Sequence, residues 1–311
     1  MLPITVFTPT YNRRNKITRV YRSLLKQDNT LFEWLIIDDG SNDGTEKTIQ
    51  ELVKQSPFKI NYFYQENGGK HRAHNKAVDY AIGDLFIILD SDDEILPNKL
   101  KLIWDTWNKF NKNNKNYAGI LAHSIDQNGK LVGRLWPKNT YVKSVVELWL
   151  DDESAYGEKM PIYVTEILKN YKFPSLEGSN ELVPEGVVWF QIAKKYKMIL
   201  LNDITRVYEV NNFDALSKSA HSDKVAVWGK SIFFAIAVDL SNRYFFYRPL
   251  RFIKIAINTS RYRYLSNISY HEQNKFINNI SAKILVILFI PIAKLLLIYK
   301  KIRNNFGKVK K

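Results

Sequence analysis

The sequence predicts an α/β protein built on a mostly parallel, Rossmann-like sheet flanked by helices, followed by a helical and basic C-terminal region. Strand-like apolar runs alternate with helix-like segments through the first 90 residues, and polar, glycine-containing sequences follow the runs. Of the 311 residues, 45% are hydrophobic and 14% aromatic, which is enough to bury a substantial core. This composition excludes a disordered or low-complexity chain.

Four apolar runs in the first 90 residues have the length and residue types of strands, at residues 4–8, 32–38, 59–65 and 84–89. Three intervening segments repeat apolar residues at helical spacing, at residues 17–26, 45–55 and 72–81. The resulting order βαβαβαβ is typical of a parallel sheet with right-handed crossover helices.

Beyond Asp93 the pattern is looser. It predicts a helix over 97–110, a strand and turn over 118–132 with Asn128-Gly129 as the turn, a helix over 184–196, and strands over 198–201 and 205–210. From residue 225 to the end the chain is expected to be helical. We therefore expect an α/β domain over 1–212, in two halves over 1–95 and 96–212, and a C-terminal region over 213–311.

The formal net charge of +15 is concentrated at the C-terminus, because residues 243–311 hold 15 of the 46 Lys and Arg residues and a single acid, Glu272. A near-neutral body with a basic tail favours a polyanionic surface as the partner of the tail. The absence of cysteine excludes disulfides, thiolate metal sites and cysteine nucleophiles. The N-terminus resembles a strand rather than a signal peptide, so we expect the body in the cytosol.

The tail contains an apolar run over 284–293, then Lys294, then apolar residues 295–299. As one helix this stretch spans about 24 Å, short of the roughly 30 Å hydrocarbon core, and Lys283, Lys294 and Lys301 would lie within about 20° of one another. We expect a helix lying on the anionic inner face of the cell membrane. A core helix, a dimer contact and a spanning helix are the alternatives.

The segments TPTYN, DDGSNDGT, ENGGKHRAHNKA and DSDDE follow the four predicted strands, where ligands of such sheets bind. Polar residues beside helix starts favour a phosphorylated ligand. Asp90 and Asp92 lie on one side of an extended segment and suit Mg²⁺ or Mn²⁺, although an acidic loop capping the next helix is the alternative. Asp38 and Asp39 could cap a helix or bind a nucleobase or ribose, and Tyr11 offers a ring for stacking.

The motifs TPTYN, IIDDGSNDGT, NGGKHRAHNKA and LDSDD, in this order and spacing, resemble the inverting family 2 glycosyltransferases of the bacterial surface-polysaccharide type. The resemblance covers residues 4–95 and continues more weakly to 209. It implies a GT-A fold, a nucleotide-sugar donor that is usually a UDP-sugar, and Mn²⁺ or Mg²⁺ as the cofactor.

The resemblance also implies roles for individual residues. The expected donor-binding residues are Pro9, Tyr11, Asp39, Asn67, Lys70, Asn75, Asp90 and Ser91. The expected metal ligands are Asp92, Asp90 and His221. For Asn75 the alternative is an ordinary helix-face residue, and for His221 a surface or core histidine. His71 and His74 give no independent metal signal.

The expected catalytic base is Glu185 in LVPEGVVWFQIAKKY, at the start of a later helix. The family commonly has a Glu-Asp pair here, whereas this chain has Gly186 after the glutamate. A first-turn residue favoured by the helix dipole is the alternative, with Glu181 and Glu177 as substitute bases.

The function expected from these observations is metal-dependent, inverting transfer of a sugar from a nucleotide diphosphate to an acceptor hydroxyl, with a lipid-linked glycan as the acceptor. A nucleotidyltransferase is the main alternative, but the glycine-rich activation loop expected of that class is missing near the N-terminus. A nucleic-acid-binding protein is a further alternative that the apolar tail disfavours, so we expect no nucleic-acid partner. The oligomeric state stays open.

Overall fold

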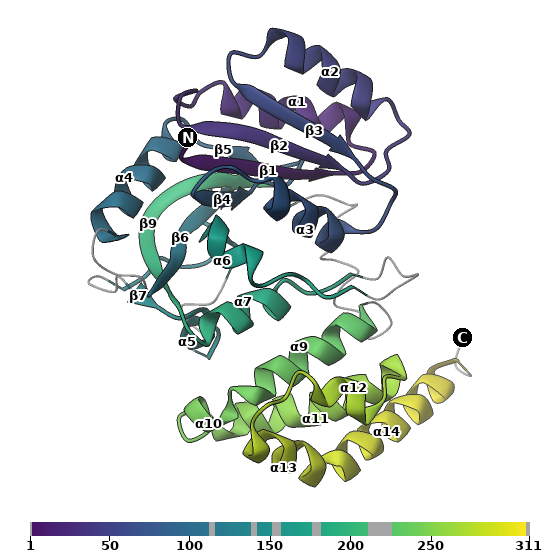
Figure 1. The fold of residues 1–311 in the computed structure, drawn as a ribbon. Coiled ribbons are helices and arrows are strands. Elements are labelled where there is room, and N and C mark those ends of the chain that lie inside the picture. The colour runs from purple at the N-terminus through teal and green to yellow at the C-terminus, as the bar shows by residue number, and fades with distance from the viewer. Residues whose placement is uncertain are drawn as a thin grey trace. The chain divides into compact units, whose positions relative to one another are not determined.

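The computed structural model describes residues 2–111, 116–137, 142–150, 157–175, 182–210 and 226–308 (Figure 1). The chain divides into two compact units. The first unit comprises Met1–Asn180 and Lys195–Ala215, and the second comprises Glu181–Lys194 and Leu216–Lys311.

The described residues of the first unit form a nine-stranded sheet in the order β3-β2-β1-β4-β8-β6-β9-β5, with β7 paired to β9. Its strands are β1 (Ile4–Thr10), β2 (Phe32–Asp38), β3 (Lys59–Tyr64), β4 (Leu85–Ile88), β5 (Glu94–Ile95), β6 (Tyr117–Asp126), β7 (Val142–Lys143), β8 (Lys159–Val164) and β9 (Lys197–Tyr208). The first four pair in parallel, whereas β8 is antiparallel to both β4 and β6. The predicted mostly parallel α/β sheet is confirmed, and the carboxyl ends of β1 to β4 meet at one edge.

Helices cover both faces of this sheet (Figure 1). They are α1 (Arg14–Leu24), α2 (Thr45–Gln55), α3 (Lys70–Tyr80), α4 (Lys99–Asn111), α5 (Val145–Leu150) and α6 (Thr165–Lys169). Side chains alternate along a strand, so Val6 and Trp34 join α1, α2 and α4 in one core, whereas Phe7 faces His74 of α3. The buried Trp34 indole donates to Thr8 Oγ1 at 2.9 Å, which satisfies its only polar atom.

The segment after β6 agrees with the predicted turn, because Gly129 has φ 80° and Ile125 bridges Leu131. The two strands predicted over 198–201 and 205–210 are instead the single strand β9. The polar residues Asn202 and Asp203 lie between the two predicted strands, but the ladder with β6 shifts register near Leu121 and continues. Irregular pairing of this kind lets one strand carry an apparent loop.

The second unit is helical in its described residues, which confirms the predicted helical C-terminal region. Its helices are α7 (Gly186–Ala193), α9 (Val227–Asp239), α10 (Ser241–Tyr244), α11 (Pro249–Ser266), α12 (Tyr270–Asn274), α13 (Ile280–Leu288) and α14 (Ile290–Lys308). The buried carboxylate of Asp239 accepts from the backbone of Asn278 and Asn279 and from Lys194 Nζ at 2.6 Å. This one side chain therefore ties α7, α9 and the start of α13 together.

The prediction of one continuous helix through residues 284–299 is wrong, because α13 ends at Leu288 and α14 begins at Ile290 with a 44° bend between them. Pro291 lacks a backbone N–H and disfavours continuation of the preceding turn. Lys283 therefore lies on a different helix from Lys294 and Lys301, so the three lysines do not form the predicted stripe along one straight helix. Across the described residues no single helix has the length and apolarity of a membrane span, although α13 and the first part of α14 meet that test as a bent pair.

Candidate functional site

The carboxylate of Asp39, just after β2, organises the glycine loop that precedes α3. It accepts hydrogen bonds from the backbone N–H groups of Gly68 and Gly69, both at 2.8 Å, and from Gln65 Nε2 at 2.7 Å. The Asn67 side chain donates to the carbonyl of Asp39 at 2.9 Å. The ends of β2 and β3 are therefore fixed against each other at the edge where the sequence predicted a ligand.

Glycine is required where this loop passes the end of β2. Gly40 has φ +92°, and a Cβ there would lie 2.9 Å from the backbone nitrogen of Asn67. A larger residue would be strained in its backbone and would push the loop outward. The close approach explains the Asp-Asp-Gly sequence in terms of packing.

The segment after β1 lies against the segment after β2. The backbone N–H of Asn12 donates to Ser41 Oγ at 2.8 Å, and the N–H of Asn42 returns a bond to Asn12 Oδ1 at 2.9 Å. Asn12 has φ 51°, a turn conformation that asparagine tolerates. The turn leaves Tyr11 49% exposed beside these loops, with Pro9 two residues earlier in β1.

Lys70, the first residue of α3, pairs with Asp90 at the end of β4. Its Nζ lies 2.8 Å from Asp90 Oδ1 and 3.0 Å from Oδ2. Burial acts to raise the pKa of Asp90, but the Lys70 ammonium outweighs it and the pKa is lowered. Ser91 is buried beside it and Asp92 is half-buried. The structure thus brings Asp39, Asn67, Lys70 and the 90–92 segment to one edge of the sheet.

Arg206 of β9 is a residue of this region to which the sequence motifs gave no role. Its Nη1 lies 3.2 Å from Asp93 Oδ2, its Nε donates to Ser124, and its guanidinium lies over the Tyr208 ring. Burial raises the pKa of Asp93, while Arg206 opposes the rise. An arginine flanked by Thr205 and Val207 in a strand-like run was the available signal, since such a side chain needs an anionic partner when buried.

The predicted metal ligands are placed only in part. Asp90 and Asp92 offer oxygen ligands of the kind that Mg²⁺ and Mn²⁺ prefer. Within the described ranges, no group of three or more His, Asp or Glu residues is placed to hold a metal ion. His221 lies outside the described residues. Asp90 and Asp92 therefore fit a metal ion that takes its remaining ligands from other groups, such as the oxygens of a substrate diphosphate.

Asn75 uses its side-chain amide to hold a neighbouring segment. Its Nδ2 donates to the Phe173 carbonyl at 2.8 Å, and its Oδ1 accepts from the Phe173 N–H at 2.9 Å. On the same helix, burial and then the nearby Lys70 lower the pKa of His74 to about 3, and its ring packs among aromatic side chains. Burial also lowers the pKa of His71. These contacts describe how α3 is packed.

Glu185 lies in the second unit, immediately before α7, and its side chain makes no capping hydrogen bond to that helix. It accepts instead from Trp189 Nε1 at 3.3 Å. A Cβ at Gly186 would lie 2.5 Å from the Phe233 ring, which explains the glycine that follows the glutamate. Glu181 and Glu177 lie outside the described residues.

The first part of the chain is similar to known glycosyltransferases. Residues 5–151 match the sequence model of Glycosyl transferase family 2. The GalNAc(5)-diNAcBac-PP-undecaprenol β-1,3-glucosyltransferase of Campylobacter jejuni is 26% identical over 73% of this chain and 71% of its own length. The poly(ribitol-phosphate) β-N-acetylglucosaminyltransferase TarS of Staphylococcus aureus is 34% identical over 32% of this chain and 18% of its own length. An uncharacterized glycosyltransferase of Nostoc is matched over 40% of its length, so the chain spans less than half of two of these three relatives.

Solved structures give the same fold. S. aureus TarS 1–349 in complex with UDP-GlcNAc superposes with a TM-score of 0.56 and 20% identity, covering 93% of this chain and 79% of that one. The mannosyltransferase PcManGT of Pyrobaculum calidifontis, in complex with GDP-Man and Mn²⁺, gives a TM-score of 0.53 and 16% identity, covering 97% and 88%. The α/β unit described above is a GT-A fold.

Proposed function

We propose that this chain, whose residues 5–151 belong to glycosyl transferase family 2, transfers a sugar from a nucleotide diphosphate donor to an acceptor hydroxyl with inversion at the anomeric carbon. A UDP-hexose or UDP-N-acetylhexosamine is the donor we propose. The relatives from C. jejuni and S. aureus are named as transferases of glucose and of N-acetylglucosamine, which supports this donor class.

The observation that carries the proposal is the convergence of four strand-end segments at one edge of the sheet. Asp39 holds the Gly68-Gly69 loop, and Lys70 pairs with Asp90 across neighbouring segments. We propose that Tyr11 and Pro9 contact the base, that Asp39 and Asn67 shape its site, and that Lys70 binds the diphosphate. A lysine is suited to this last role because its ammonium is a compact charge with three donors.

We propose that Asp92, with Asp90, holds Mn²⁺ or Mg²⁺. When bound, such an ion neutralises negative charge on the diphosphate leaving group. Two carboxylates fit a magnesium or manganese ion that takes its other ligands from phosphate and water. His221 remains a proposed further ligand. The manganese complex of the P. calidifontis structure supports the choice of metal for a protein of this fold.

Glu185 is our proposed general base. A carboxylate that takes the proton from the acceptor hydroxyl makes the oxygen a better nucleophile, and direct attack then needs no covalent enzyme intermediate. The Trp189 indole donates to one oxygen of Glu185 at 3.3 Å, which holds the carboxylate beside the start of α7. Ser91 and Asn75 stay in the proposed donor site, Asn75 through the Phe173 segment that its amide holds.

We further propose that the second unit associates with the anionic inner face of the cell membrane and that the acceptor is a lipid-linked glycan of surface-polysaccharide synthesis. Many apolar side chains of α13 and α14 are exposed, including Leu288 and Leu295 at 65% each. The basic residues of the tail add attraction to anionic lipids. The C. jejuni relative is named for an undecaprenol-linked substrate, which supports this class of acceptor.

A screen of nucleotide sugars with Mn²⁺ tests the proposed reaction. The purified full chain should slowly hydrolyse one donor and release nucleoside diphosphate, and release should stop with a chelator. Release of pyrophosphate from a nucleoside triphosphate and a sugar phosphate would identify the nucleotidyltransferase alternative instead. Turnover that is equal with and without chelator would contradict the metal proposal alone.

A further inference from the structure

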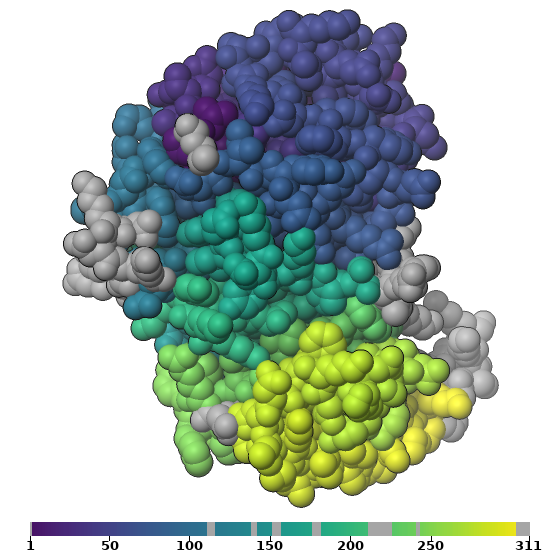
Figure 2. Space-filling model, in the orientation of Figure 1, coloured from purple at the N-terminus to yellow at the C-terminus, as the bar shows by residue number. Residues whose placement is uncertain are grey.

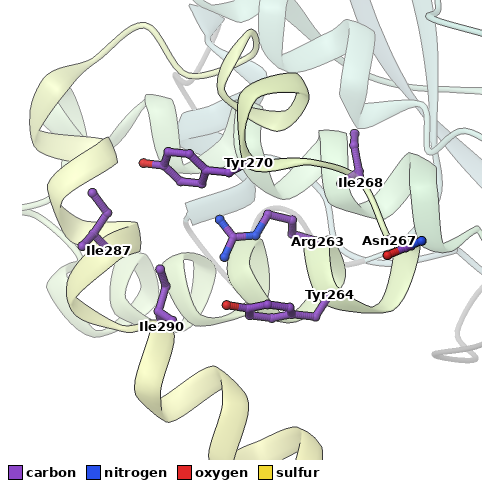
Figure 3. Close-up of a pocket in the computed structure, with 7 residues that line it drawn as sticks. All are labelled: Arg263, Tyr264, Asn267, Ile268, Tyr270, Ile287 and Ile290. Atoms are coloured by element: carbon purple, nitrogen blue, oxygen red, sulfur yellow. The ribbon is translucent and has the colours of Figure 1, made fainter.

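A pocket of about 570 Å³ lies within the second unit, where α11, α12 and the α13–α14 break come together (Figure 3). Arg263 and Tyr264 enter it from α11, Tyr270 from α12, and Ile287 and Ile290 from the two sides of the break. The pocket has no role in the proposed donor site, all of whose residues belong to the first unit.

The guanidinium of Arg263 points into this pocket. Its central carbon lies 4.8 Å from the Tyr264 ring and 5.0 Å from the Tyr270 ring, and the residue is only 6% exposed. Figure 3 shows the guanidinium between the two rings, with all three side chains directed toward Ile287 and Ile290. Two tyrosine hydroxyls therefore flank the guanidinium on the same side.

The three carboxylates of the second unit that the structure describes are engaged elsewhere, and Glu185 accepts from Trp189 Nε1. Asp239 binds Lys194 and the backbone before α13. The carboxylate of Glu272 accepts from the backbone N–H of Ser269 at 3.1 Å, in the capping box of α12. Among the described residues, no ion pair joins a carboxylate to Arg263.

A buried guanidinium that faces two aromatic rings is only partly compensated. Cation–π contacts stabilise it, but no charged acceptor for its five N–H donors lies within the part of the chain that the structure describes. Desolvation of such a charge is costly unless an anion completes the site. Phosphate oxygens match the planar donor fork of arginine, and the tyrosine hydroxyls add two further donors.

The residues around the pocket indicate which kind of molecule would supply that phosphate. Ile287 lines the pocket and is also 51% exposed, so the pocket wall continues onto the outer face of α13. The exposed apolar side chains of this face and of α14 are Ile280, Ile284, Ile287, Leu288, Ile292, Leu295, Leu296, Ile298, Tyr299 and Ile302. The exposed ammonium of Lys294 lies 5.6 Å from the Tyr264 ring, which adds a second cation at the rim. Figure 2 shows the yellow side chains of α13 and α14 at the molecular surface.

We infer that this pocket binds the phosphate headgroup of an anionic membrane lipid, with Arg263 as its ligand and the exposed face of α13 and α14 against the acyl chains. The inference rests on the membrane association proposed above and adds a defined headgroup site to it. Non-specific attraction of a basic surface to lipid needs no such site, so the two are separable by experiment.

The first experiment measures binding of the full chain to phosphatidylcholine vesicles with and without phosphatidylglycerol. R248Q is the matched control, because Arg248 also lies against a tyrosine ring, 5.0 Å from Tyr247, but is exposed. R248Q should weaken binding to the anionic vesicles by up to about fivefold, the share of one basic residue near such a surface. R263Q should weaken binding to the same vesicles about tenfold more than R248Q does. Equal losses in the two variants would overturn the inference.

The second experiment supplies the missing anion from within the protein. In I287E a carboxylate enters the pocket wall that faces Arg263, whereas I284E adds the same charge on the same helix at a position that is 53% exposed and outside the pocket. I287E should have the higher Tm of the two and should lose its preference for phosphatidylglycerol. An I287E protein that is less stable than I284E, or that keeps the preference, would contradict the inference.

The third experiment distinguishes a lipid from free phosphate. Monomeric dihexanoylphosphatidylglycerol should raise the Tm of the wild-type chain but not of R263Q, and inorganic phosphate at equal concentration should have no such effect. An equal rise with inorganic phosphate would replace the lipid with a soluble anion and overturn the inference. Donor hydrolysis by the wild-type chain, measured without lipid, reports on the proposed transferase activity independently of these results.

Discussion

The Lys70 ammonium lies 2.8 Å from Asp90 Oδ1, although the two residues follow different strands of the sheet. Lys70 begins α3 after β3, and Asp90 follows β4. The pair fixes the position of a cation and of a carboxylate at the edge where the donor diphosphate is proposed to bind. In the absence of ligand each charge serves as the counter-ion of the other.

Lys70 can be tested by replacement with methionine, which keeps the length of the side chain and removes its charge. K70M should bind UDP about tenfold or more weakly, because a phosphate contact of a partly buried ammonium is lost. K76M is the control, since Lys76 is a half-buried lysine of the same helix whose Nζ donates to the Tyr64 carbonyl at 2.8 Å. Titration calorimetry measures both affinities, and equal affinities would contradict the role of Lys70.

Asp92→Asn should nearly abolish sugar transfer while the fold persists. The change removes a charged oxygen ligand without altering the volume of the side chain, and a chelator should have the same effect. D105N is a suitable control, because Asp105 is an exposed carboxylate of α4 paired with Lys101. Turnover with Mn²⁺ and circular dichroism are the measurements. Full activity in D92N would remove Asp92 from the proposed metal site.

Glu185→Gln should lower the rate of transfer by about 10² to 10⁴, because the amide cannot accept the proton of the acceptor hydroxyl. The affinity for the nucleotide should barely change. A loss below about tenfold would favour the first-turn role of Glu185 and direct attention to Glu181 and then to Glu177. Rates at saturating donor, together with nucleotide binding, separate the two outcomes.

The stability of the first unit should decline as the pH falls below about 6.5. Burial lowers the pKa of His74 to about 3, so the unfolded chain takes up a proton there that the folded chain does not. This single histidine should lower the free energy of unfolding by about 2 kcal/mol between pH 7 and pH 5. Its stabilising contribution is fully present above the pKa that the histidine has in the unfolded chain, and it is lost as the pH falls below that value. Denaturant titrations at several pH values should show a shallower decline in H74L. An identical pH profile in H74L would exclude His74 as a source of the effect.

Exposed apolar residues of α13 and α14 should be needed for vesicle binding. Deleting the chain after Ser281 would also remove Ala282, Val286 and Ala293, which are buried in the second unit, so surface variants are cleaner. The triple variant L288S/L295S/I298S should lose most vesicle binding at high salt, where apolar contacts persist and charge attraction is screened. Its melting temperature should stay close to that of the wild type.

A second triple variant, F246S/Y247S/L250S, is the control. These residues are at least as exposed as the first set, at 93%, 66% and 73%, but precede α13 in the chain. Retained binding is the expected result. If this variant loses binding and the first does not, the membrane contact lies upstream, within residues 243–263.

The first half of the fold was predictable because its strands and helices are regular. The predicted boundaries of β2 and α2 agree with the structure, which also brings Asp39, Lys70 and Asp90 of the strand-end motifs to one edge of the sheet. Local pattern marks Arg206 as an arginine in a strand, but it could not name the partner, because Asp93 lies far away in the sequence. Periodicity also could not place the break between α13 and α14, since a periodicity argument assumes a straight helix and does not weigh the missing backbone N–H of Pro291.

The contact between position 186 and Phe233 has an evolutionary consequence. Any side chain at position 186 meets the Phe233 ring, and that ring is itself packed against Phe190 and Phe234. A single substitution therefore cannot add an aspartate after Glu185 without displacing an aromatic cluster. The two positions are expected to change only together, so G186D should be tolerated in an F233A background and disruptive alone.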